Sequence, residues 1–166
     1  MAKEPKKLEE LFHDTLKDIY FAEKKILSAL PKIAKAAQNE DLKAAFQKHE
    51  RETEEQVSRL EQVFDLLAKK PQGKSCAAIL GIIEEGQEIM KEYKGSPALD
   101  AGLLAAAQAV EHYEISRYAT LIAWAEELDL DDAVTLLQET LEEEKATDEA
   151  LTEIAKTAIN QQAEAA

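Results

Sequence analysis

Two glutamates, Glu111 and Glu114, fall on the apolar stripe of a segment that otherwise has the pattern of a buried helix face. On a helical wheel they align with positions expected to face a core, namely Leu104, Ala107, Ile115, Tyr118 and Ile122. Carboxylates are rarely buried without a partner, because removing their charge from water costs free energy. The pattern therefore indicates a salt bridge, a protonated acid or a bound metal ion.

Acidic side chains also lie on the inward faces of three other amphipathic segments. Glu23 follows Ile19 by one turn on an apolar stripe, and Glu52 lies at the edge of the inward face of the next segment. Glu144 and Asp148 share the inward side of the last segment. Each glutamate lies near the middle of its segment, so the acids are expected to meet at one level of the fold.

Carboxylates that meet in an apolar interior repel one another strongly. Protonation would relieve part of this repulsion, whereas two divalent cations would relieve all of it. Oxygen-rich ligands favour iron or manganese, and the lack of inward cysteines argues against structural zinc. We therefore predict a dinuclear site with two iron or manganese ions and these ligands: Glu23, Glu52, Glu111 and Glu144. The residues predicted to complete or support the ligand set are His49, Glu114 and Asp148.

Five helices are predicted to carry these residues, because apolar residues recur at intervals of three and four and Gly and Pro are few. They cover residues 8–37, 41–68, 76–93, 98–127 and 131–160. Pro31 is expected to kink the first helix, and Leu11 belongs to its apolar stripe. The chain is expected to form one domain over residues 1–166, with its core at about 8–160 and frayed ends.

The connection between the second and third long helices decides the fold. A short connection would make these two helices antiparallel, but about thirty residues separate them, and most of these residues are predicted to be helical. A connector of that length can return along the bundle and make the two helices parallel. The predicted fold is therefore all-α: a ferritin-like four-helix bundle with a long helical crossover, five helices in total.

The ligand pattern departs from that of known ferritin-like sites, which use a Glu-x-x-His pair on each of two helices. The second helix has the order His49-x-x-Glu52, with Glu55 where that pattern places histidine. The last long helix has Thr147 at the corresponding position. The predicted site is therefore richer in carboxylate than the usual one.

Four segments resemble the YciF-like family of bacterial ferritin-like proteins, and the likeness extends from about residue 8 to residue 158. The segments are 18–24, 49–60, 108–114 and 143–148, of which the Glu111-His112-Tyr113-Glu114 block is the most specific. The resemblance implies a five-helix, rubrerythrin-related bundle with a dinuclear metal site. It also implies a homodimer and an association with bacterial stress responses, but it assigns no reaction.

Charge and composition exclude several classes of function. A formal net charge of -14 would repel nucleic acid and anionic membrane surfaces. No apolar run has the length of a membrane span, and the charged start of the chain indicates a cytoplasmic protein. The single cysteine, Cys76, cannot form an internal disulfide and is expected to be a small buried residue.

Three functions are consistent with these observations. The first is a dinuclear metalloprotein of stress defence that reacts with peroxide or oxygen, as a possible oxidoreductase. The second is an iron-handling, ferroxidase-like protein that stores no iron in a cage. The third is a metal-free helical adaptor that acts through its acidic surface or through a dimer face.

Overall fold

The computed structural model describes residues 5–165, which contain helices and no strand. The helices are α1 (Leu8–Ala36), α2 (Glu40–Leu66), α3 (Ala77–Glu92), α4 (Leu99–Glu127) and α5 (Asp131–Ile154). A π-helical turn, η1 (Ala155–Ile159), and the short α6 (Asn160–Glu164) extend α5. The predicted helices are confirmed to within a few residues, except that the last helical segment continues to Glu164. Of the ends expected to fray, residues 1–4 and 166 lie outside the described part of the chain.

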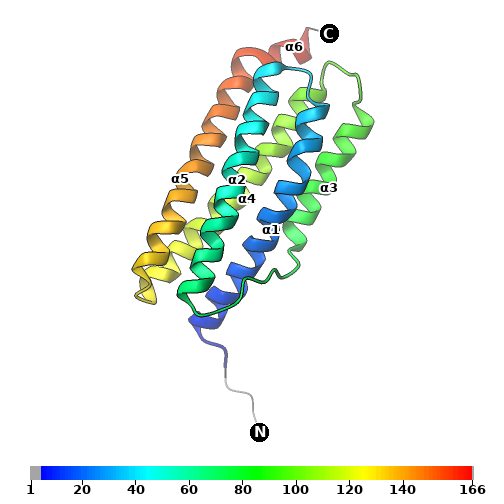
Figure 1. Ribbon diagram of the computed structural model, residues 1–166. Coiled ribbons are helices and arrows are strands. Elements are labelled where there is room, and N and C mark those ends of the chain that lie inside the picture. Colours follow the sequence, from blue (N-terminus) through cyan, green and yellow to red (C-terminus); the bar gives the residue numbers. More distant parts are fainter. Residues whose placement is uncertain (1–4, 166) are drawn as a thin grey trace.

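The four long helices α1, α2, α4 and α5 form a bundle, and α3 lies outside it against α1 and α4. Figure 1 shows that α1 and α2 are antiparallel, as are α4 and α5, whereas α2 and α4 run in the same direction. The strap of residues 67–76 and α3 together return the chain along the bundle between these two parallel helices (Figure 1). The predicted ferritin-like topology with a helical crossover is therefore confirmed.

Local hydrogen bonds fix where the helices begin. The Asn39 side chain caps α2 by accepting a hydrogen bond from the backbone of Leu42, 3.1 Å away. The buried carboxylate of Asp100, in the first turn of α4, accepts hydrogen bonds from the backbone N–H groups of Gln38 and Asn39, at 2.8 and 2.7 Å. This carboxylate therefore joins the α1–α2 turn to the start of α4. Pro31 lies on the exposed side of α1, and the helix continues past it to Ala36.

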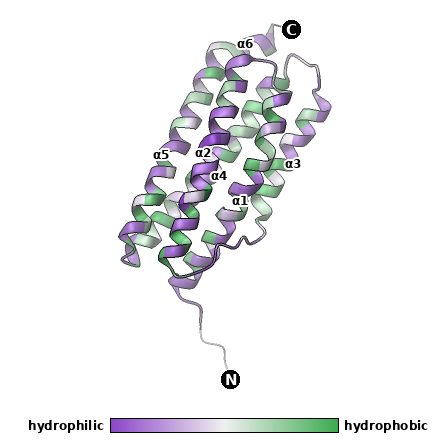
Figure 2. Ribbon diagram, in the orientation of Figure 1, coloured by the Kyte–Doolittle hydropathy of each residue, from purple (hydrophilic) through white to green (hydrophobic). Residues whose placement is uncertain are grey.

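The interior contains two apolar clusters, one toward each end of the bundle. The first includes Phe12, Leu16, Leu60, Phe64, Leu121 and Leu137. The second includes Leu42, Phe46, Leu99, Leu103, Leu151 and Ile159. Along every bundle helix, buried polar residues separate or adjoin these clusters. Figure 2 shows hydrophilic and hydrophobic residues mixed along each long helix.

The expected place of Leu11 on the apolar stripe is wrong, because its side chain is 48% exposed near the start of α1.

The crossover helix α3 packs on α4 and α1 and buries fewer residues than each bundle helix does. Its buried residues are Ile79 and Gly86, and Ile83, Ile89 and Met90 are partly buried against the core clusters. Close contact with α4 depends on Gly102, where an added Cβ would lie 2.6 Å from Cγ2 of Ile89. The strap before α3 is pinned to α1 by a 3.0 Å backbone hydrogen bond from Lys74 to Lys17. No described helix combines the length and the apolar character that a membrane span requires.

Candidate metal centre

Four ionisable side chains meet in the polar layer between the two apolar clusters. They are His49 of α2, Glu111 and Glu114 of α4, and Glu144 of α5. One nitrogen or oxygen atom from each lies within 4.8 Å of the others, and all four side chains are buried. Glu111 and Glu114 reach this layer together because residues three apart project from the same face of a helix. This grouping is the kind that could hold a metal ion.

Glu23 brings α1 into the same layer. Its side chain is fully buried, and Oε1 accepts a short hydrogen bond from the Tyr118 hydroxyl of α4. The sequence placed Tyr118, one turn after Glu114, only among the residues expected to face the core. The observed partner of that hydroxyl is a member of the acid cluster. Tyr118 is itself buried, and burial together with the Glu23 charge raises its pKa well above the usual tyrosine range.

Burial and mutual repulsion raise the pKa values of all four carboxyl groups. For Glu23 the pKa rises from 4.5 to about 8, through loss of water first and the charge of Glu144 second. Burial likewise raises the pKa of Glu111 to about 8. The pKa values of Glu114 and Glu144 lie well above 4.5, again chiefly because these groups are removed from water. Without a bound cation, burial therefore favours the protonated, uncharged form of these acids.

The donor atoms of this cluster are poorly satisfied by the protein itself. When the acids are ionised, six carboxylate oxygens of the cluster have no group that donates a hydrogen bond to them: Oε2 of Glu23, Oε2 of Glu111, and both oxygens of Glu114 and of Glu144. A proton shared between Glu23 and Glu114, or between Glu111 and Glu144, would satisfy only part of this set. Buried polar atoms without partners are rare in folded proteins and call for an explanation, of which an ion is one. In their ionised form the four carboxylates would carry the negative charge that two divalent cations neutralise. The residues present therefore fit a metal site with oxygen ligands.

His49 has the arrangement of a histidine ligand held by a carboxylate. Its Nδ1 lies 2.9 Å from Oε1 of Glu111, while the buried Nε2 has no partner. A carboxylate at one ring nitrogen fixes the orientation of the ring and leaves the lone pair of the other nitrogen for a metal. His49 thus adds one nitrogen donor to an otherwise carboxylate set.

The structure places two predicted ligands at the rim rather than in the cluster. Glu52 pairs with Lys48, one turn earlier on α2, and its other oxygen lies 3.5 Å from the Thr147 hydroxyl. Asp148 lies 3.1 Å from both the Gln108 amide and Nε2 of His112. Both carboxylates remain close enough for their charges to raise the pKa of Glu111.

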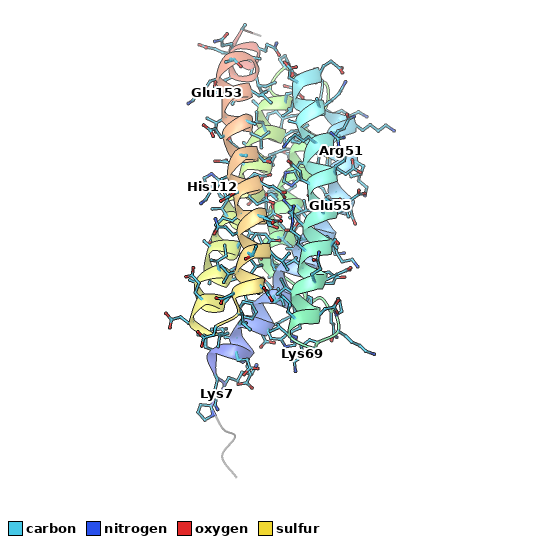
Figure 3. All side chains as sticks on the ribbon, turned by 60° about the vertical axis from the view of Figure 1, so that its left-hand side comes forward. Lys7, Arg51, Glu55, Lys69, His112 and Glu153 are labelled. Carbon is cyan, nitrogen blue, oxygen red and sulfur yellow. The ribbon has the colours of Figure 1, made fainter. Side chains whose placement is uncertain are left out.

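Other polar residues near the cluster serve different contacts. Arg59 of α2 binds both oxygens of Glu143 of α5 at 2.7 Å, and the buried Gln56 amide lies 3.1 Å from the same carboxylate. Spacing along the sequence gives no signal for this pair of residues on two different helices. Glu55 and His112, which flank the predicted ligands in sequence, are exposed on the outside of the bundle (Figure 3).

The chain is similar to known proteins over nearly its whole length. Protein YciF of Escherichia coli is 45% identical over 160 residues, covering 96% of each chain. The crystal structure of that protein, described as a stress protein, superposes with a TM-score of 0.89 at 44% identity and covers 94% of this chain and 99% of the other. A Rhodopseudomonas palustris protein, YcfI, described as a candidate structural protein, superposes with a TM-score of 0.86 at 47% identity. The match covers 92% of this chain and 97% of the other.

A more distant likeness shows the fold alone. The structure of a Xanthomonas campestris protein gives a TM-score of 0.70 at 18% identity and covers 90% of this chain and 92% of the other. Residues 7–164 match a family described as a domain of unknown function, DUF892. Together with the likeness to YciF, this match shows that the chain belongs to the YciF-like, DUF892 family of helical bundle proteins.

Proposed function

We propose that this protein is a dinuclear carboxylate metalloprotein that binds two iron or manganese ions and reacts with peroxide or oxygen. The observation that carries the proposal is the set of unpartnered carboxylate oxygens in the buried layer. Folding four acids into an apolar bundle opposes stability unless their charge is compensated. A pair of divalent ions would compensate it and would give each bundle helix a role.

The proposed ligands fall into two groups. Glu23, Glu111, Glu114 and Glu144 supply oxygens inside the bundle, and His49 supplies a nitrogen. Glu52 and Asp148 stand at the rim, where their carboxylates can accept protons and exchange them with water. The chemistry that such an ion pair supplies when bound is electron exchange with a small oxidant.

The surrounding residues shape how an oxidant would meet this site. Tyr118 holds Glu23 in one orientation and offers a hydroxyl proton inside the bundle. The apolar clusters above and below the layer exclude bulk water, which strengthens charge interactions at the site. The E. coli relative is described as a stress protein, and we extend that role to this chain as part of the proposal, with a homodimer as the expected assembly.

Elemental analysis of protein purified without chelators tests the proposal. We expect about two iron or manganese ions per chain, and we expect the Glu111→Gln variant to lose metal while circular dichroism shows an unchanged helix content. Glu55→Gln is the matched control, because Glu55 is an exposed carboxylate on α2. An empty wild-type chain after anaerobic loading, or a Glu111→Gln variant with wild-type metal content, would overturn the assignment and favour the metal-free adaptor.

A further inference from the structure

An apolar cavity of about 230 Å³ lies beside the candidate centre, between α1, α3 and α4. Its walls include Ile26 of α1, Phe46 of α2, Ile83 of α3, Val110 of α4 and Leu151 of α5. Small side chains at several wall positions leave room for this cavity. Those small residues are Ala29, Ala45, Ala106 and Ala107.

The two ends of this cavity differ in chemistry. At the inner end lie His49 and Glu111, which belong to the acid cluster. At the outer end two exposed lysines of α1, Lys25 and Lys32, contribute to the lining. They are seven residues apart, so they project from the same side of α1 two turns apart. Neither forms an ion pair within residues 5–165, although the chain as a whole has a formal net charge of -14.

We propose that this cavity binds a medium-chain carboxylic acid, with the acyl chain in the apolar interior and the carboxylate at Lys25 and Lys32. The volume is below the range of pockets for drug-sized ligands, which favours a slender alkyl chain. The positive rim favours an anionic head group on an otherwise acidic protein. The inner end offers carboxyl groups and no lysine or arginine, which disfavours the opposite orientation in the metal-free protein. This binding site does not depend on a metal ion and goes beyond the proposed reaction.

Calorimetric titration of the full chain with decanoate, below its micelle concentration, tests the proposal. We expect one decanoate per chain and weaker binding of decyltrimethylammonium, which has the same chain length and the opposite charge. The charge-reversed double variant Lys25→Glu/Lys32→Glu should bind decanoate about tenfold more weakly, because favourable charge interactions at the rim become unfavourable. The matched control Lys24→Glu/Lys35→Glu makes the same charge change on α1 at positions outside the cavity lining.

A second variant tests the cavity itself. Ala29→Leu places a larger side chain in the wall and should also weaken decanoate binding about tenfold, because it removes space for the acyl chain. Ala109→Leu, at an exposed position of α4, is the control that should bind normally. If circular dichroism shows that Ala29→Leu is unfolded, the lysine variants still decide the question.

Four results would overturn the proposal. The first is the absence of decanoate binding, and the second is equal weakening by both lysine double variants. The third is binding that requires manganese loading and ignores the lysines, which would place the carboxylate at the inner end. The fourth is a dimer, seen by sedimentation, that neither binds decanoate nor dissociates with it, because a second copy of the chain would then cover the cavity.

Discussion

Replacing Glu111 by glutamine should change the stability of this protein in opposite directions with and without metal. Glutamine has nearly the same volume and keeps an oxygen that can accept the hydrogen bond from His49. It removes a buried carboxyl group whose pKa is raised to about 8 by burial. The substitution therefore separates the electrostatic cost of the acid cluster from the packing of the bundle.

The magnitude follows from the pKa shift of Glu111. A carboxyl with a pKa of about 8 when folded and 4.5 when unfolded lowers the free energy of unfolding at pH 7 by up to about 3 kcal/mol. In metal-free protein, Glu111→Gln should recover part of this and raise the melting temperature by about 5–10 °C. Below pH 4.5 the carboxyl is protonated in both states, and the advantage of the variant should vanish.

Metal should reverse the order of the two proteins. An ion that binds only the folded state at a thousand times its Kd adds about 4 kcal/mol to the free energy of unfolding. Wild-type protein should gain this stabilisation with manganese, whereas the variant should gain little. Differential scanning calorimetry of both proteins at pH 7, with chelator and with manganese, measures all four values.

The Glu111→Gln experiment has one control variant, and two results would refute the reasoning behind it. Glu55→Gln removes an exposed carboxylate from α2 and should shift the free energy of unfolding by less than about 0.5 kcal/mol in either condition. A metal-free Glu111→Gln protein that melts below wild type would show that the carboxylate is favourably paired. A variant that gains as much from manganese as wild type would show that Glu111 is not needed for binding.

Three further predictions test other parts of the structure. Metal-free wild-type protein should lose stability as the pH rises from 4.5 through about 8, because the folded state binds more protons than the unfolded state in that window; melting curves across pH, with and without manganese, measure this loss. Tyr118→Phe should cost about 1–3 kcal/mol in urea unfolding, because it leaves the buried Glu23 without its donor, whereas exposed Tyr93→Phe should change little. Leu137→Ala should cost about 2–5 kcal/mol and Leu11→Ala less than about 0.5 kcal/mol, as urea denaturation can show, because only Leu137 is buried.

Periodicity predicted the helices and the buried acids well because both depend on which face of a helix is apolar. Glu23, Glu111, Glu114 and Glu144 are all buried as expected. The same reasoning failed for Leu11, which is 48% exposed although its neighbour Phe12 is buried. The two side chains lie about 100° apart around α1, and only the side that carries Phe12 faces the other helices. An apolar residue at the edge of a stripe can therefore remain exposed.

The finer arrangement of the site depends on contacts between helices, which a single sequence does not encode in its spacing. Glu52 was placed near an inward face, yet one turn of α2 also brings Lys48 within reach of it. The link between Tyr118 and Glu23 joins residues 95 positions apart. Such pairs follow from the relative height and rotation of packed helices, and these quantities became known only with the structure.

The small number of fully buried residues in α3 has a consequence for how the molecule fluctuates. Besides Ile79 and Gly86 this helix packs only partly buried side chains on the core clusters, so it has less apolar area to lose on detaching than the bundle helices have. Its amide hydrogens should therefore exchange with solvent through a local opening that leaves the four bundle helices intact. In such a partly opened form the inner wall of the bundle becomes reachable from outside, so molecules too large for the closed entrance could still enter, at a rate set by the opening of α3.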